Sequence, residues 1–132
     1  MAPIATFEDA ARLARALSEV TESERHGNRT WFVAGKAFAW ERPFSRADIR
    51  RFGEVTPPQG PIVAVSTADL AEKEALLAAH PVGLFTISHF DGYPAVLVHL
   101  PTVSAAVLRA VVLDGWLARA PAHLTASYLE RH

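Results

Sequence analysis

The order of apolar and polar residues divides this chain into alternating strand-like and helix-like segments. The clearest pair is Leu84–Ser88 and Ala95–His99, two mainly apolar runs on either side of Asp91-Gly92. Asp-Gly between two such runs is typical of a tight β-hairpin turn, because glycine tolerates the positive φ that the turn requires. Pro94 cannot donate a ladder hydrogen bond, so we place it at the start of the second strand. The pattern therefore predicts a hairpin over residues 84–99.

Three further strands are predicted upstream, near residues 30–33, 36–41 and 62–65, the first two joined around Ala34-Gly35. The polar stretch Glu22–Asn28 is interpreted as a loop that precedes them. Residues 56–61 contain three prolines, which remove backbone donors and restrict their neighbours, so we expect an irregular loop there.

The strand at 36–41 has two chemically different faces. Its two-residue period places Lys36, Phe38 and Trp40 on one face and Ala37 and Ala39 on the other. The small alanine face suits close contact with a helix. The aromatic face is then either part of a core or an exposed surface for a ligand or partner, and both readings stay open.

Helical spacing and capping residues predict five helices. Thr6 caps a first helix whose apolar stripe runs from Phe7 to Val20, and Ser45 caps a short helix over 46–52 that ends at Gly53. A third helix runs from Leu70 to His80. Ser104 caps a fourth, and Pro121 begins a fifth. We expect Leu97, Val111 and Trp116 to lie in or beside the core between the sheet and the last helices.

These elements predict one α+β domain over residues 1–132, because short strand connections favour antiparallel pairing with helices packed on the sheet. Its expected architecture has two layers, with a five-stranded, mainly antiparallel sheet. The formal net charge is −1, there is no cysteine, and no apolar run is long enough to span a bilayer. The N-terminus also lacks the features of a signal peptide, so we expect a cytoplasmic protein with no membrane partner.

One cluster of cations stands out in this nearly neutral chain. Arg42, Arg46, Arg50 and Arg51 lie close together, with Lys36 and Trp40 shortly before them. Cations that neutralise phosphates supply most of the non-specific affinity for nucleic acids, and an aromatic ring can stack on a base. The same pattern also fits a solvated surface helix with partial ion pairing.

The turn of the predicted hairpin holds a second group of candidate residues. His89, Asp91 and Tyr93 lie in it, and His99 follows on the second strand. They are candidates for a ligand or proton-transfer site, although histidines that are simply hydrogen-bonded at a turn have the same pattern. No metal-ligand spacing, phosphate loop or nucleophile elbow is present, so we predict no metal, no cofactor and no enzymatic activity.

Several phrases of the sequence together resemble the MmcQ/YjbR family. They include Trp31-Phe32-Val33, Gly35–Trp40, Asp69–Leu77, His89–Val98 and Trp116–Pro121, which cover nearly the whole chain in the family's order. The resemblance implies a compact α+β fold with a curved antiparallel sheet, grouped with CyaY-like and secretion-chaperone-like folds. Family members are commonly described as DNA-binding proteins, and no reaction is generally ascribed to them.

The resemblance and the cationic cluster together lead to a functional hypothesis. We expect weak, sequence-tolerant DNA binding through the Arg42–Arg51 segment, by a monomer or a weak dimer. The alternative is a protein- or small-molecule-binding module that uses the aromatic sheet face around Phe38 and Trp40.

Overall fold

A computed structural model describes residues 4–132, which form five α-helices, one 3-10 turn and six strands. The helices are α1 (Phe7–Arg15), α2 (Arg46–Phe52), α3 (Leu70–Ala79), α4 (Ala105–Arg119) and α5 (Ala122–Arg131). The strands are β1 (Val20–Arg25), β2 (Asn28–Val33), β3 (Lys36–Glu41), β4 (Ile62–Ser66), β5 (Leu84–Phe85) and β6 (Ala95–His99), and the 3-10 turn is η1 (Ser88–Phe90).

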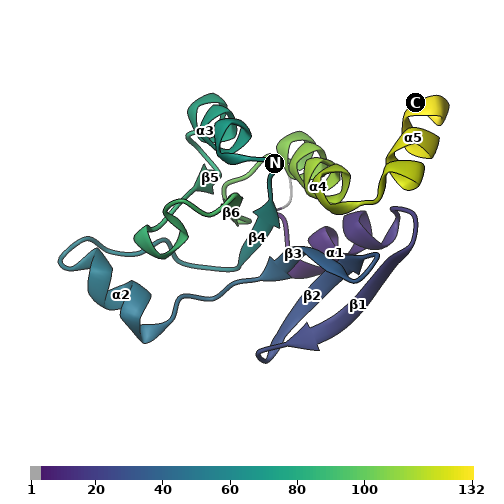
Figure 1. Cartoon of the computed structure of the whole chain (residues 1–132). Helices are drawn as coiled ribbons and strands as arrows, with labels where there is room; N and C mark the ends of the chain where they lie inside the picture. The colour runs from purple at the N-terminus through teal and green to yellow at the C-terminus, as the bar shows by residue number, and fades with distance from the viewer. Residues whose placement is uncertain (1–3) are drawn as a thin grey trace.

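All six strands join one antiparallel sheet in the order β1-β2-β3-β4-β6-β5. Helices α1, α3 and α4 lie along one face of this sheet, and α5 follows α4 at its end (Figure 1). The α+β class predicted from the sequence is therefore confirmed, as are the antiparallel strands. The expected number of strands was wrong, because the sheet has six rather than five.

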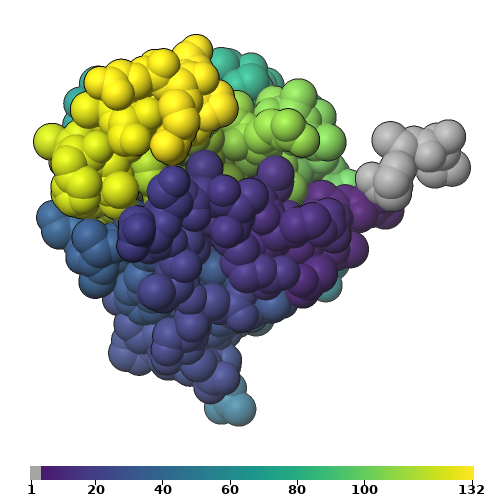
Figure 2. Space-filling model, turned by 90° about the vertical axis from the view of Figure 1, so that its right-hand side faces the viewer, coloured from purple at the N-terminus to yellow at the C-terminus, as the bar shows by residue number. Residues whose placement is uncertain are grey.

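The additional strand is β1, which the sequence pattern assigned partly to the first helix and partly to a loop. The helix ends at Arg15, and Glu19 adopts a φ of 61° that redirects the chain into the strand. Five of the six β1 residues are exposed, so the strand has no apolar alternation to reveal it. Its turn into β2 uses His26 and Gly27, both at positive φ, which is the geometry of a two-residue hairpin. Figure 2 shows β1 below the yellow helix α5.

The predicted hairpin over 84–99 is confirmed in its pairing and wrong in its turn. Leu84 pairs with Val98 and Phe85 with Leu97, but the first strand ends there rather than at Ser88. The chain then leaves the sheet through η1 and returns at Ala95. Gly92, at φ 73°, belongs to a four-residue turn that Tyr93 N closes on Phe90 O at 3.0 Å. The Asp-Gly signal therefore marks a turn within a longer excursion rather than the hairpin turn itself.

A β-bulge in β3 changes the face on which its aromatic residues lie. Trp31 pairs with Ala39 and Phe32 with Ala37, so Phe38 is an extra residue without a partner. Phe38 turns into the helix-side core and is fully buried, whereas Trp40 lies on the opposite face. The predicted aromatic face with Lys36, Phe38 and Trp40 together is therefore wrong, because the two-residue period is interrupted at the bulge.

Each face of the sheet has its own apolar cluster. The larger one lies under the helices and contains Val111 and Trp116, as predicted. Helix α4 approaches the sheet closely at Gly115, where a Cβ atom would lie 2.5 Å from Val65 Cγ1. The smaller cluster covers the other face and contains Leu97 and Phe90. Leu97 is buried as expected, but it lies on the face away from the helices.

The predicted helix boundaries at the capping residues are confirmed. Thr6 and Ser45 each form a capping box, with Asp9 and Asp48 respectively. Ser104 accepts from Val107 N at 3.1 Å, and Pro121 immediately precedes α5. None of the helices within residues 4–132 has the length and apolar character needed to cross a membrane.

Candidate functional site

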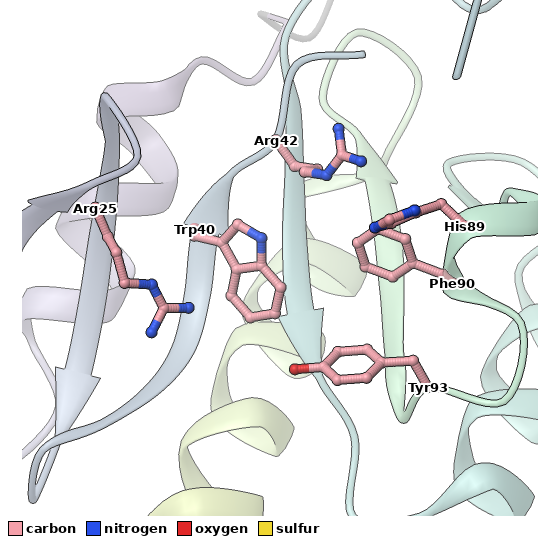
Figure 3. Close-up of a pocket in the computed structure, with 6 residues that line it drawn as sticks. All are labelled: Arg25, Trp40, Arg42, His89, Phe90 and Tyr93. Carbon is pink, nitrogen blue, oxygen red and sulfur yellow. The ribbon is translucent and has the colours of Figure 1, made fainter. Parts of the chain in front are cut away.

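A hollow of about 230 Å³ lies on the sheet face that the helices leave uncovered. We call it the sheet-face groove, and its lining residues are Arg25, Trp40, Arg42, His89, Phe90 and Tyr93. They come from β1, β3, the residue after β3, η1 and the turn that follows it. Figure 3 shows Trp40 between Arg25 on one side and the aromatic residues of the 89–93 segment on the other.

Trp40 forms the floor of the groove because its neighbours in the sheet are small. It pairs with Thr30 on β2 and with Ala64 on β4. Neither side chain is large enough to cover an indole ring, and Trp40 is only half-buried. The sheet therefore presents one face of a large aromatic side chain to the hollow.

The wall opposite Arg25 is built by the turn that closes between Phe90 and Tyr93. Phe90 is buried and packs edge-on against Tyr93, with ring centroids 5.8 Å apart and planes at 90°. Tyr93 is 48% exposed, and its hydroxyl points toward Trp40 (Figure 3). Together Trp40 and Tyr93 offer two partly uncovered aromatic side chains to a planar ligand.

The two arginines of the groove have different electrostatic situations. Arg25 is exposed at the end of β1, with its guanidinium 5.7 Å from the Phe32 ring centroid. Arg42 lies over the Phe90 ring at 5.4 Å and forms an ion pair with Asp48 at 2.9 Å. Arg25 is therefore the better placed of the two to neutralise a bound anion.

Asp48 is the buried carboxylate that holds one side of the groove together. Its side chain is 1% exposed and its Oδ2 atom accepts from Ser45 N and pairs with Arg42. Arg51 Nη1 approaches the other oxygen at 3.6 Å, which is too long for a hydrogen bond. Burial alone would raise the pKa of Asp48, but the Ser45 amide and Arg42 outweigh it and hold this pKa below its ordinary value.

The lowered pKa of Asp48 predicts an acid-dependent contribution to stability. A carboxyl whose pKa is depressed in the folded state stabilises the fold above its unfolded pKa, and this stabilisation is lost as the pH falls toward the folded value. We expect Asp48→Asn to cost about 2–3 kcal/mol at neutral pH and much less near pH 2. Urea unfolding at both pH values measures the difference. The matched control is Glu54→Gln, an exposed carboxylate, and an equal loss for Asp48→Asn at both pH values would contradict the prediction.

The groove continues into a neighbouring hollow of about 350 Å³. The two hollows share Arg25, Trp40 and Arg42, and the second extends past Thr30 to Phe44. The open sheet face is thus an elongated surface rather than a single closed pocket. Its shape suits a ligand that extends across strands β1 to β3.

The structure brings together four of the residues predicted from the sequence, namely Trp40, Arg42, His89 and Tyr93. Arg25 and Phe90 were missed. Arg25 was missed because β1 was interpreted as a loop. The sequence signal that could have identified this strand was Gly27, since glycine tolerates the positive φ of a tight hairpin turn, which it adopts here.

The other predicted residues lie outside the groove. Lys36 pairs with Val33, whose side chain is in the helix-side core. Because directly paired residues share a face, Lys36 lies on the helix side of the sheet and not on the groove side. Arg46 and Arg50 are exposed on α2, and Arg51 leans toward Asp48. The Arg42–Arg51 segment therefore does not form one continuous cationic surface within the groove.

The histidines and the aspartate at the predicted turn do not converge. In the His99 ring, Nδ1 lies 2.8 Å from Thr102 Oγ1 and Nε2 lies 2.6 Å from Gln59 O. The backbone N–H of His99 donates to Gly83 O, so neither the ring nor the backbone amide is paired with the 89–91 segment. Asp91 is exposed on the turn. Within residues 4–132, no group of three or more His, Asp or Glu side chains is arranged to hold a metal ion.

Comparison with known proteins places the chain among mycobacterial relatives. It is 40% identical over 129 residues to Uncharacterized protein Rv2570 of Mycobacterium tuberculosis and to Uncharacterized protein Mb2600 of Mycobacterium bovis. Each alignment covers 96% of this chain and 97% of the relative. The chain belongs to the family of these proteins. No protein-family model matches the chain, and no solved structure matches it.

Proposed function

We propose that this protein binds single-stranded nucleic acid, weakly and without sequence preference, along the sheet-face groove. The observation that carries the proposal is the combination of two partly exposed aromatic side chains, Trp40 and Tyr93, with the exposed cation Arg25 around one hollow. An aromatic ring stacks on any base, and a cation beside it neutralises the adjacent phosphate.

The single-stranded form is favoured because stacking requires unpaired bases. In a duplex the bases are stacked on one another, and their faces cannot reach Trp40. The elongated hollow over β1 to β3 also suits an extended strand more than a duplex. The net charge of −1 is consistent with weak binding, because it adds no general attraction for phosphates.

The MmcQ/YjbR resemblance supports the same proposal from another direction. That family is commonly described as DNA-binding, and the phrase His89–Val98 that carries the resemblance supplies one wall of the groove. We propose that the chain is a member of that family and that its sheet face, more than the Arg42–Arg51 segment, contacts the nucleic acid.

The test is fluorescence anisotropy with short labelled oligonucleotides at low and at moderate salt. We expect single-stranded DNA or RNA to bind more tightly than the duplex, with affinity falling as salt rises. Trp40→Ala should weaken binding roughly five- to 150-fold, because one stacked base contributes about 1–3 kcal/mol. Arg25→Ala should reduce the slope of log affinity against log salt by about 0.7, since one phosphate contact is lost.

Two controls make this experiment specific for the groove. Arg109→Ala removes one exposed cation from α4, on the helix layer, and should leave the salt dependence unchanged. The double variant Arg46→Ala with Arg50→Ala removes two cations from α2. If this double variant flattens the salt dependence while Arg25→Ala does not, α2 is the interface and the groove is not. If wild-type protein binds none of the oligonucleotides at low salt, the proposed function is wrong.

A further inference from the structure

Lys73 is a charged residue in an unusual place for a lysine. It lies on α3, in the helix layer, and is only 6% exposed. Lysines are almost never buried so completely unless their ammonium group has partners. Its Nζ atom donates to Phe90 O at 2.6 Å and to Tyr93 O at 2.8 Å.

The two carbonyls belong to the first and the last residue of one turn. Tyr93 N closes this turn on Phe90 O, with Asp91 at φ −59° and ψ 130° and Gly92 at φ 73°. The segment between β5 and β6 lies outside the strand ladder, so the sheet does not order it by pairing. One ammonium group therefore fastens both ends of the turn to α3.

The same turn carries the aromatic wall of the sheet-face groove. Phe90 and Tyr93 both line it, and their backbone carbonyls are the atoms that Lys73 holds. Burial lowers the pKa of Lys73, and the negative charge of Asp91 on the turn opposes this shift. Removing a lysine ammonium group from water is unfavourable, and its hydrogen bonds to the two carbonyls must offset that cost.

We propose that Lys73 is a positioning residue that holds the Phe90–Tyr93 turn in the conformation which forms the groove. It touches no ligand itself. It orders the two aromatic side chains before binding, so a ligand does not have to supply that ordering free energy. The effect on nucleic acid affinity rests on the proposed function, whereas the effect on the turn does not.

The first test needs no substitution. Lys36 and Lys73 are the two lysines of the chain, so nitrogen-15 labelling of lysine side chains yields two ammonium signals. We expect the Lys73 ammonium protons to exchange slowly with water and to show couplings across the hydrogen bonds to the carbonyls of Phe90 and Tyr93. A Lys73 ammonium group that exchanges as fast as that of exposed Lys36 would overturn the proposal.

The second test is Lys73→Met, which keeps an unbranched apolar side chain but removes all three donors. Tyr93 and Tyr128 are the two tyrosines, so fluorotyrosine labelling yields two fluorine signals. The variant Tyr128→Phe removes one of them, and the remaining signal is that of Tyr93 in the groove. We expect the Tyr93 signal to shift toward that of an unfolded chain, with Tyr128 unchanged. The matched control is Lys36→Met, which should move neither signal.

Binding is then measured on the same variants with the same oligonucleotides. In Lys73→Met the aromatic side chains of the turn are no longer ordered before binding. The variant should therefore bind single-stranded DNA roughly two- to tenfold more weakly for each aromatic side chain that becomes fixed only when the DNA binds. If the Tyr93 signal shifts but wild-type protein binds no oligonucleotide, the positioning role stands and the proposed function is wrong. If wild-type protein binds and Lys73→Met binds equally with an unchanged Tyr93 signal, the positioning role is wrong. Should Lys73→Met fail to fold, the exchange and coupling measurements on wild-type protein decide.

Discussion

Trp116→Ala is expected to lower the free energy of unfolding by about 3–5 kcal/mol, the loss typical of truncating a fully buried tryptophan. Trp116 is fully buried under the helix layer, and its Nε1–H donates to Ser18 O at 3.0 Å. The indole is therefore part of the helix-side core and also fastens the segment between α1 and β1. Its removal leaves a cavity and an unpaired carbonyl.

Urea denaturation followed by circular dichroism measures this loss. Trp40→Ala is the matched control, because it removes the same side chain from a half-buried position in the groove. We expect the control to cost clearly less than Trp116→Ala. Equal losses for the two variants would mean that the helix-side core is not the main source of stability.

Leu97→Ala should cost about 2–5 kcal/mol, and its effect should appear on the groove side of the sheet. Leu97 is fully buried, on the face opposite the helices, in the cluster with Ile62, Ala64 and Phe90. Its removal leaves a cavity beside Phe90, which lines the groove. The substitution should therefore disturb the groove as well as stability.

Two measurements distinguish a Leu97 side chain on the groove side of the sheet from one under the helices. Urea denaturation gives the loss of stability, with exposed Leu129→Ala as a control that should change it by less than about 0.5 kcal/mol. Methyl and aromatic chemical shifts then locate the disturbance. We expect shifts at Phe90 and Trp40 and little change at Val111, and the reverse pattern would place Leu97 on the helix side.

The division of the sheet into two faces explains how the groove is supported. Helix α4 covers one face so closely that Gly115 leaves no space for a Cβ atom beside Val65. The other face is covered only in part, by Phe90, Phe44 and their neighbours around β4 and β6. The uncovered part over β1 to β3 is where Trp40 and Arg25 lie. A ligand surface on a sheet is held more rigidly than one built from loops alone.

Local signals in the sequence were enough to predict most elements. Capping residues such as Thr6, Ser45 and Ser104 act within one helical turn, so their effect can be read from neighbouring positions. The apolar runs that became β4 and β6 are buried on both faces, and such runs indicate strands covered on both sides. These features determined the α+β class and the antiparallel sheet.

The sequence did not determine the strand β1 or the turn that forms the groove wall. Strand β1 is polar and exposed, and it forms because its backbone pairs with β2, which leaves no apolar period. The turn at Phe90–Tyr93 is anchored by Lys73, seventeen or more residues away along the chain. Contacts of this kind depend on how α3 packs against the sheet.

The assignment of side chains to faces was likewise decided by the tertiary structure. The two-residue period predicts that Phe38 and Trp40 share a face, but a bulge moves Phe38 into the helix-side core. Arg25 reaches Trp40 only because β1 and β3 both flank β2. The sequence by itself determined most of the elements that form, though not β1, since caps and apolar periods act locally. Only the packing of these elements decided which side chains meet in the groove, because bulges, strand order and buried anchors are non-local.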